Sequence, residues 1–469
     1  MMNETVVIAF PQLHKRGERL ARLGLAMTHH RGAIQMIQWL VVLFYLVVVS
    51  VPAFLPLPDA DAHIYNNLVL FAQLLFWGIW WPFVILSMFV MGRVWCGVFC
   101  PEGALSEWVS RHGLGRAVPR WMKWGGWPFV AFVLTTLYGQ LVSVYEYPQA
   151  ALLVLGGSTV AAIAIGLVYG RGKRVWCRHL CPVSGVFGLL ARLAPVQFKV
   201  NREQWNQSAQ RVHMPIDCAP LIDVRRMTGT SECHMCGRCA GHRDAVALAT
   251  RLPGSEVASL REHDAKPWEA RLVVFGLLGV AFGAFQWSAS PWFVSLKQII
   301  AGWLVARDDY TLLQDNAPWW LLTHYPQVND TFSWLDGLCI LFYIGATALL
   351  VGGWIWLWLY LAGRSLPGNG HRNRLRLAYA LVPLGGVSVF VGLSLLTTSQ
   401  LQGERVVLPW ANDLRLILLV GAALWSLSLA RTMVRSAAVT RAHGLAALTM
   451  VALAMVSVPA LWFVQFRIW

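Results

Sequence analysis

The chain has 469 residues, of which 57% are hydrophobic and only 13% are charged, and its mean hydropathy is +0.53. A soluble protein carries about 25% charged residues, so this composition excludes an ordinary soluble fold and indicates a membrane protein. The formal net charge of +15 is compatible with nucleic acid binding, but the basic residues are distributed as they are in membrane proteins.

Nine apolar stretches are long enough to cross a bilayer, since a spanning helix needs roughly 20 apolar residues. They cover residues 36–55, 68–92, 125–145, 150–169, 271–289, 335–361, 377–398, 414–430 and 444–465. The sequence therefore predicts an all-α polytopic membrane protein with about nine transmembrane helices. Residues 1–35 are too polar for a cleaved signal peptide, and we expect them to form a cytoplasmic N-terminal segment.

The basic residues predict the orientation. With the N-terminus inside, 33 of the 38 Lys and Arg residues fall on one side of the membrane. The five exceptions are Lys297, Arg307, Arg405, Arg415 and Arg467. This asymmetry follows the positive-inside rule and predicts a multi-pass protein of the bacterial inner membrane, with Trp469 outside. It favours the lipid bilayer as the partner of the basic residues and excludes nucleic acid as a partner of this protein.

The polar segments divide the rest of the chain into three parts. Residues 36–170 contain two transmembrane hairpins, and residues 171–270 form a cytoplasmic insert with six of the nine cysteines. Residues 271–469 contain five further helices and an outer loop, residues 290–334. Apolar residues of this loop, from Trp292 to Leu304, fall on one helical face, which predicts a helix lying in the outer interface.

Two segments of nine residues repeat one another, 81 residues apart. Arg93-Val-Trp-Cys96-Gly-Val-Phe-Cys100-Pro101 is matched by Arg174-Val-Trp-Cys177-Arg-His-Leu-Cys181-Pro182, with six identical positions. Each copy follows a predicted hairpin. We therefore expect two equivalent hairpins, related by a pseudo-twofold axis along the membrane normal, to bring Cys-x-x-x-Cys-Pro to the same inner surface.

Cysteines four residues apart lie on one face of a helix, so each copy offers two thiolates. Four thiolates match the ligand set of a [4Fe–4S] or [2Fe–2S] cluster, and Arg93 and Arg174 would offset their negative charge. A redox-active dithiol, a mononuclear metal site and helix packing by small thiols are the alternatives. The residues that we expect to surround one centre are Cys96, Cys100, Cys177 and Cys181.

A second group of cysteines lies within the insert. Cys233, Cys236 and Cys239 have the Cys-x-x-Cys-x-x-Cys spacing of a ferredoxin loop, and Cys218 is the expected remote ligand. Four thiolates also suit a structural zinc ion, but the two consecutive two-residue spacings favour a cluster. His234 and His242 flank this group, where we expect ordinary solvated histidines. The lone Cys339 lies in an apolar span and is expected to pack there as a small hydrophobe.

The twin motifs, followed by this cysteine-rich segment, resemble the NapH/NosR-type membrane polyferredoxins over about residues 36–250. The resemblance implies [4Fe–4S] clusters, here two, and electron transfer linked to the quinone pool or to a redox maturation pathway. The sequence departs from that pattern in one important way: Arg243 stands where the fourth cysteine of the ferredoxin run is expected. The spans after residue 335 have no counterpart in the pattern.

Two functions follow from these features. The first is a membrane-bound iron–sulfur protein that passes electrons between quinol, or a cytoplasmic donor, and a partner redox protein. The second is a metal-handling or assembly factor, for example one that reduces or delivers copper, because thiolates also bind copper(I). In either case the chain is expected to be a component of a redox system rather than a stand-alone enzyme.

Overall fold

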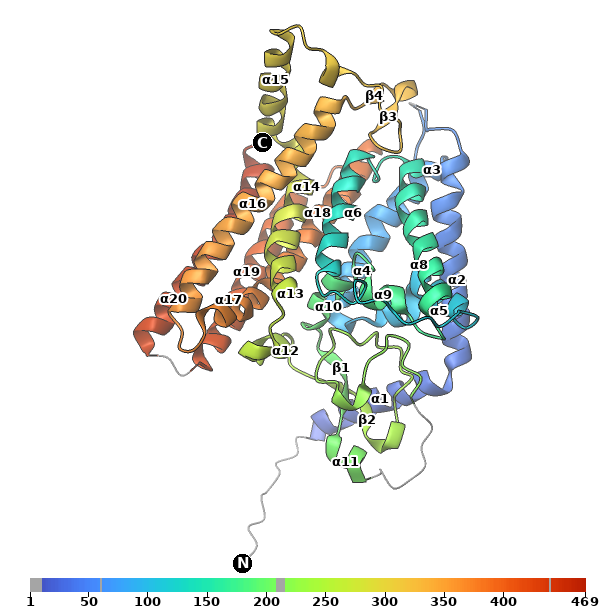
Figure 1. Ribbon diagram of the computed structural model, residues 1–469, viewed down its shortest axis with the longest axis vertical. Coiled ribbons are helices and arrows are strands. Elements are labelled where there is room, and N and C mark those ends of the chain that lie inside the picture. Colours follow the sequence, from blue (N-terminus) through green and yellow to red (C-terminus); the bar gives the residue numbers. More distant parts are fainter. Residues whose placement is uncertain (1–10, 60, 208–215, 438–439) are drawn as a thin grey trace, which may run out of the picture.

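The computed structural model describes residues 11–59, 61–207, 216–437 and 440–469, and it is predominantly helical (Figure 1). Within these residues, eight helical segments have the length and apolar composition needed to cross a membrane. A ninth apolar helix, α6 (Trp127–Leu141), has 15 residues. Every one of the nine predicted stretches is helical, so the all-α polytopic fold is confirmed.

Four helical segments of the N-terminal half run through the apolar part of the molecule. They are α2 (Arg31–Ser50), then α3 (Leu68–Gln73) with a π-helical stretch and α4 (Trp81–Met91), then α6, and finally α7 (Pro148–Ala151) with a π-helical stretch and α8 (Gly157–Tyr169). The side chain of Asn67 begins α3 by accepting hydrogen bonds from the backbone N–H groups of Val69 and Leu70. Gly92, with φ of +60°, ends α4.

The C-terminal half supplies five more segments. They are α13 (Pro267–Arg271) with a π-helical stretch and α14 (Phe282–Gln286), α16 (Trp334–Arg364), α17 (Gly370–Ala378) with α18 (Val382–Gly403), α19 (Ala411–Arg435) and α20 (Arg441–Arg467). Ser333 and Asp336 form a capping box at the start of α16, in which each side chain bonds the backbone N–H of the other residue.

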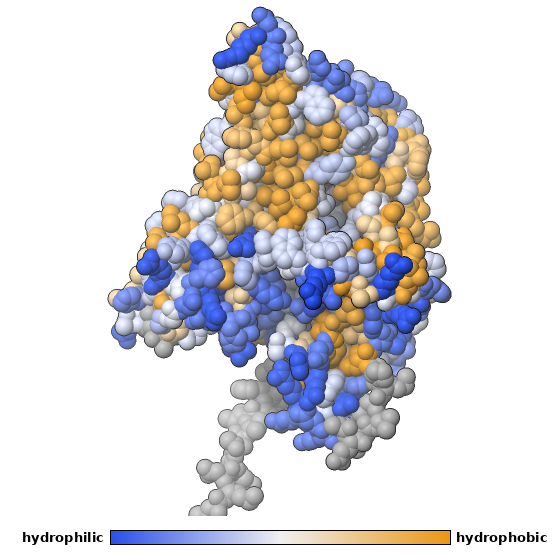
Figure 2. Space-filling view, in the orientation of Figure 1, coloured by the Kyte–Doolittle hydropathy of each residue, from blue (hydrophilic) through white to orange (hydrophobic). Residues whose placement is uncertain are grey.

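The surface of the bundle is apolar in the middle and hydrophilic at both ends (Figure 2). We call the end that carries residues 171–207, residues 216–266 and α1 (Pro11–His29) the insert side. The helix α1 lies there, whereas the C-terminal residue lies toward the other end of the bundle, near the base of α15 (Figure 1). An odd number of crossings accounts for this separation.

The insert combines short helices at the edge of the bundle with a small sheet beyond them. The helices at the bundle edge are α9 (Val175–His179), α10 (Ser184–Ala191) and α12 (Ser255–Ala258), with α5 (Pro101–Ser110) at the same level, and α11 (Arg202–Gln207) lies at the far end of the insert. The strands β1 (Val196–Val200) and β2 (Val246–Thr250) pair antiparallel, with Phe198 opposite Leu248. The helix α1 packs on this sheet, where Gly24 faces Leu248.

The loop at the other end contains α15 (Pro291–Val305) and a short hairpin of β3 (His324–Tyr325) and β4 (Asp330–Thr331). Figure 1 shows α15 running along the long axis of the molecule, beside the end of α16, so the expectation of a helix lying flat in the interface is wrong. The reason is that the start of α16, a helix of 31 residues, offers α15 a protein surface to pack on. Phe293 and Leu304 bury their side chains in the cluster that includes Leu335, Cys339 and Ile340 of α16.

Candidate metal centres

The twin motifs form similar turns at the insert side of the bundle. Cys96 lies in a helical turn, Trp95–Phe99, and Cys177 lies in α9, but each helix ends before the second cysteine. Cys100 has an extended conformation (φ −70°, ψ 117°), because a residue before proline is disfavoured in a helix. The expectation that one helical face carries both cysteines of a pair is therefore wrong.

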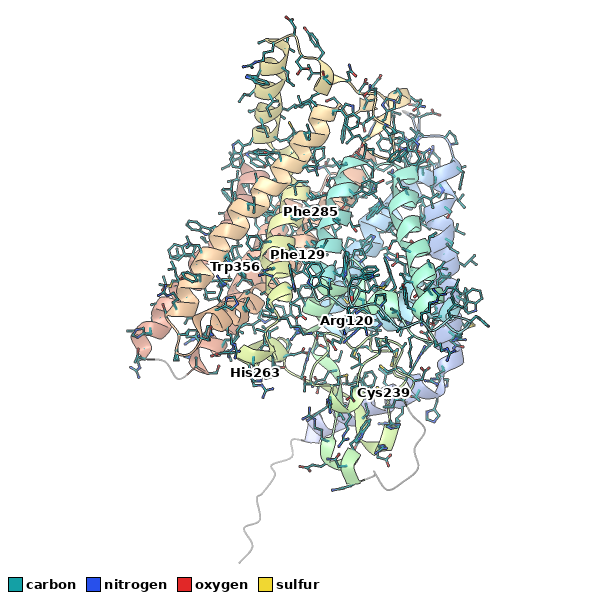
Figure 3. All side chains as sticks on the ribbon, in the orientation of Figure 1. Arg120, Phe129, Cys239, His263, Phe285 and Trp356 are labelled. Carbon is teal, nitrogen blue, oxygen red and sulfur yellow. The ribbon has the colours of Figure 1, made fainter. Side chains whose placement is uncertain are left out.

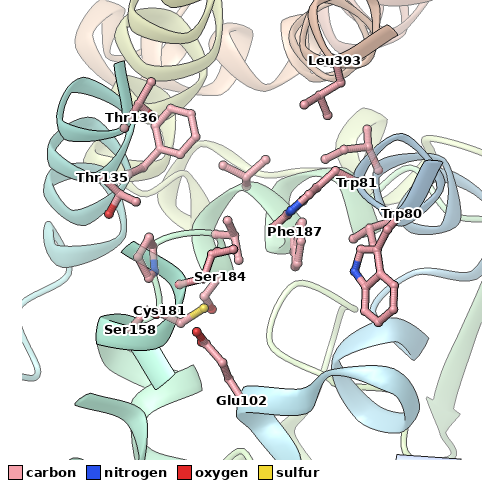
Figure 4. A pocket seen from close by; sticks show the side chains of 18 of the residues that line it. Trp80, Trp81, Glu102, Thr135, Thr136, Ser158, Cys181, Ser184, Phe187 and Leu393 are labelled. Atoms are coloured by element: carbon pink, nitrogen blue, oxygen red, sulfur yellow. The ribbon is translucent and has the colours of Figure 1, made fainter. Parts of the chain in front are cut away.

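All four cysteines nevertheless line one cavity of about 240 Å³. Its walls are mainly aromatic and aliphatic. Figure 4 shows Cys181 near Glu102 and Ser158 at one end, and Trp80, Trp81 and Phe187 along another side. Cys100 and Cys181 are partly buried, and the desolvation of their thiols raises their pKa values above the ordinary range.

Two buried arginines, one from each motif copy, lie beside this cavity. Arg174 is 1% exposed, and its Nε donates to Oε2 of Glu107 at 2.8 Å. Its Nη1 donates to the carbonyl of Cys96. Arg93 donates to the carbonyl of Ser231 at 2.7 Å. Burial alone would lower the pKa of Arg93, but the neighbouring cysteines, Cys96 first among them, raise it above its ordinary value.

The second group, Cys218, Cys233, Cys236 and Cys239, lines a separate small cavity within the insert. Figure 3 shows Cys239 in the insert, beyond the helices that carry Phe129 and Phe285. Met235 and Gly237 have positive φ values of 53° and 77°, which turn the loop tightly around the sulfurs. The backbone N–H of Met235 donates to the sulfur of Cys233 at 3.4 Å.

Burial raises the pKa of the Cys177 and Cys233 thiols to about 12, which keeps both of them protonated at neutral pH. A metal centre must displace such protons when it binds. Within the described residues, no group of three or more His, Cys, Asp or Glu side chains is arranged to hold a single metal ion.

The helix α1 covers the second group, which sequence reasoning missed. The hydroxyl of Thr28 donates to the carbonyl of Gly237 at 2.6 Å. The Cβ of Met27 would lie 2.5 Å from a Cβ at Gly237, so that position admits only glycine. The sequence assigns α1 only a polar, basic character, and nothing in residues 1–35 indicates a contact more than 200 positions away.

One of the two histidines flanking this group differs from expectation. His234 is 2% exposed, so its expected solvation is wrong, and its Nδ1 has no hydrogen-bond partner within the described residues. The ring is buried because the 233–239 loop packs against the twin motifs rather than projecting into solvent. The ring of His242 lies 5.1 Å from that of Trp205, centroid to centroid. The guanidinium of Arg243 also lies over the Trp205 ring, at 5.3 Å.

The buried donors test whether these residues fit an iron–sulfur cluster. Within the described part of the chain, Nε of Arg93 and Nη2 of Arg174 have no hydrogen-bond acceptor. A buried, unsatisfied donor costs about 1–3 kcal/mol. The sulfurs of an iron–sulfur cluster accept hydrogen bonds that tune it, so the arginines and the four cysteines fit such a group. Cys339 lies elsewhere, buried among Ile340, Ile344 and Leu335.

Comparisons with known proteins match the segments that contain the twin motifs. The family described as a 4Fe-4S binding domain matches residues 73–123 and 153–202, which are the two segments that contain the twin motifs. No solved structure matches the chain significantly.

Three curated relatives have low identity but a common character. The chain is 22% identical over 227 residues to the putative electron transport protein YccM of Escherichia coli, covering 43% of this chain and 62% of that protein. It is 27% identical over 178 residues to the regulatory protein NosR of Pseudomonas aeruginosa, covering 34% and 25%. It is 24% identical over 183 residues to the ferredoxin-type protein NapH of Escherichia coli, covering 34% and 62%.

The matches therefore span less than two thirds of the length of each of these relatives. They confirm the resemblance to membrane ferredoxin-type electron transport proteins and support [4Fe–4S] binding by the repeated segments.

Proposed function

We propose that this chain is a membrane-bound electron carrier that holds two [4Fe–4S] clusters. Cys96, Cys100, Cys177 and Cys181 would hold the first, and Cys218, Cys233, Cys236 and Cys239 the second. The observation that carries the proposal is the meeting of two motifs, 81 residues apart, along one cavity beside two buried arginines. Such clusters supply one-electron transfer at potentials set by charge, hydrogen bonds and exposure.

The protein residues around the first group of cysteines exclude water from it and compensate its negative charge. Trp80, Trp81 and Phe187 line the cavity and exclude water. Arg93 and Arg174 place two positive charges beside thiolates that are otherwise costly to bury. A low-dielectric site of this kind favours electron transfer over hydrolysis of the metal centre.

We further propose that quinol, drawn from the bilayer, is the electron donor at this cavity. The cavity is larger than a four-cysteine site requires, because α6 lines it from Phe132 to Gly139, a rise of about 10 Å. Its apolar walls and a few hydroxyl groups, those of Thr135, Thr136 and Ser158, are typical of a site for a ring with polar substituents.

The insert would then face the cytoplasm of a bacterial inner membrane, as the excess of basic residues on that side favours. Electrons passed to the second group would leave through a partner redox protein that docks on the insert. The chain by itself would be a redox component without a substrate transformation of its own.

Anaerobic purification tests the cluster assignment. We expect a brown protein with about eight irons and eight acid-labile sulfides per chain, and loss of about half of both in Cys100→Ser. A colourless protein that binds stoichiometric zinc or copper would contradict the proposal and would support the metal-handling alternative.

The quinol assignment needs a separate test. Thr136→Phe fills the cavity, whereas Leu134→Phe adds the same ring to an exposed position of α6. We expect the first variant to slow reduction of the clusters by a quinol analogue and to leave reduction by dithionite unchanged. Equal quinol kinetics in the two variants would place the donor elsewhere.

A further inference from the structure

The two groups of cysteines touch through one residue of the first motif. A Cβ added at Gly97 would lie 2.0 Å from the carbonyl oxygen of His234 and 2.9 Å from the backbone nitrogen of Cys236. Both obstacles are backbone atoms, which cannot rotate away as a side chain can. Gln38 holds the position from the other direction, because its Nε2 donates to the carbonyl of Gly97 at 2.9 Å.

The second motif copy reaches the same loop by different chemistry. The residue equivalent to Gly97 in the repeat is Arg178. Its guanidinium pairs with Glu232 at 2.9 Å, one residue before Cys233. Both copies therefore contact the loop that begins at Glu232. The first copy does so through the backbone at Gly97, and the second does so through the ion pair of Arg178. The two copies therefore differ at the position where the first copy, with Gly97, must leave room for the loop.

Further bonds hold the insert against the motifs at this contact. The backbone N–H of Arg174 donates to the carbonyl of Ala219 at 2.8 Å. Lys173 donates to the carbonyl of Cys218 at 3.1 Å. These bonds flank the remote cysteine of the second group, just as the Gly97 contact flanks Cys236. The junction is thus fixed at two separate places.

We propose that Gly97 is a positioning residue that sets the separation of the two metal centres and forms the shortest route between them. The proposal rests on the function proposed above. Cys96 is joined to Gly97 by a peptide bond, and the backbone of Cys236 lies so close to Gly97 that a Cβ added there would come within 3.0 Å of its Cα. Cys96 of the first group and Cys236 of the second are therefore connected through Gly97 and one non-bonded contact. Any side chain at position 97 must push the 234–236 loop away.

The test compares Gly97→Ala and Gly97→Val with Gly345→Ala. Gly345 is a helical glycine of α16 whose added Cβ meets no atom within 4 Å. The readouts are iron content and the magnetic interaction between the two reduced clusters in electron paramagnetic resonance. We expect the wild type and Gly345→Ala to show spin–spin broadening. The two Gly97 variants should show weaker broadening, weakest in the Val variant, while Gly97→Ala keeps its iron.

Each result decides between structural possibilities. Unchanged broadening in Gly97→Ala with full iron content would overturn the positioning role and leave the two-cluster function intact. Wild-type protein without iron–sulfur signals would instead defeat the proposed function itself. Loss of the second cluster alone in Gly97→Val supports the proposal, because it shows that the contact seats the loop. If Gly97→Val loses all iron, the broadening in Gly97→Ala decides whether Gly97 has the positioning role.

Discussion

Glu107 offers the sharpest test of how the insert is attached to the bundle. It lies on α5, is 5% exposed, and sits between Arg174 of the second motif and Arg238 of the insert. Burial alone would raise its pKa, but the two guanidinium groups, Arg174 first, lower it below its ordinary value. The carboxylate is therefore ionised at neutral pH and bridges two parts of the protein.

Replacing Glu107 with Ala leaves the buried guanidinium of Arg174 and the partly buried guanidinium of Arg238 without their shared acceptor. Removing one partner of a buried pair costs about 3–5 kcal/mol. Arg174 keeps its bond to the carbonyl of Cys96, and Arg238 keeps a 3.4 Å contact with Asp217, so we expect the lower end of that range. A loss of about 3 kcal/mol corresponds to a roughly 100-fold larger population of the undocked insert.

Hydrogen exchange of the backbone amides of residues 216–239 measures that population. We expect the protection of this segment to fall by roughly 100-fold in Glu107→Ala, and by less in Glu107→Gln, which retains one acceptor oxygen. Glu203→Gln, an exposed change on α11, is the matched control. The double variant Glu107→Ala/Arg238→Ala should recover part of the protection, because one unpaired charge is gone. Protection within twofold of wild type in Glu107→Ala would refute this reasoning.

Three further predictions follow from the same contacts. Cys233→Ser should remove about four irons per chain while the protein stays in the membrane, and Cys339→Ala should leave the iron content unchanged; metal analysis of both variants checks this. Thr28→Val removes the bond of α1 to the 233–239 loop and should speed the loss of iron to a chelator, whereas Thr449→Val, on the exposed face of α20, should not. A phosphatase fused after Trp469 should be active outside the cytoplasm, and activity only inside would contradict nine crossings.

The predictability of the fold reflects the strength of hydrophobic patterning. A segment of about 20 apolar residues satisfies its backbone only as a helix in lipid, so each of the nine stretches was recognisable without any tertiary information. The orientation of α15 was not, because its apolar stripe from Trp292 to Leu304 suits either a lipid surface or a protein surface. The start of α16 decides between these two surfaces, and its place beside α15 follows from tertiary packing.

The cysteine groups were predictable in membership but not in surroundings. Repetition and spacing identify Cys96 and Cys177 as equivalents, and the local geometry of Cys100 follows from Pro101. The burial of His234 depends on how the insert meets the bundle, which no local pattern encodes. One available signal was the mismatch between Gly97 and Arg178, which is among the three positions at which the two copies differ.

The C-terminal spans form part of the wall of the cavity, which gives them a role. Val389 and Leu393 of α18 line it, as does Phe285 of α14. The π-helical stretch Leu272–Ala281, which leads into α14, is buried almost throughout. The two repeated hairpins alone would leave the cavity open on the side that these helices occupy. Since a redox centre in an apolar site is shielded only when every wall is present, the C-terminal half completes the environment of the cysteines without contributing a ligand to it. A chain truncated before α16 should therefore retain both cysteine motifs and still fail to protect the first centre from water.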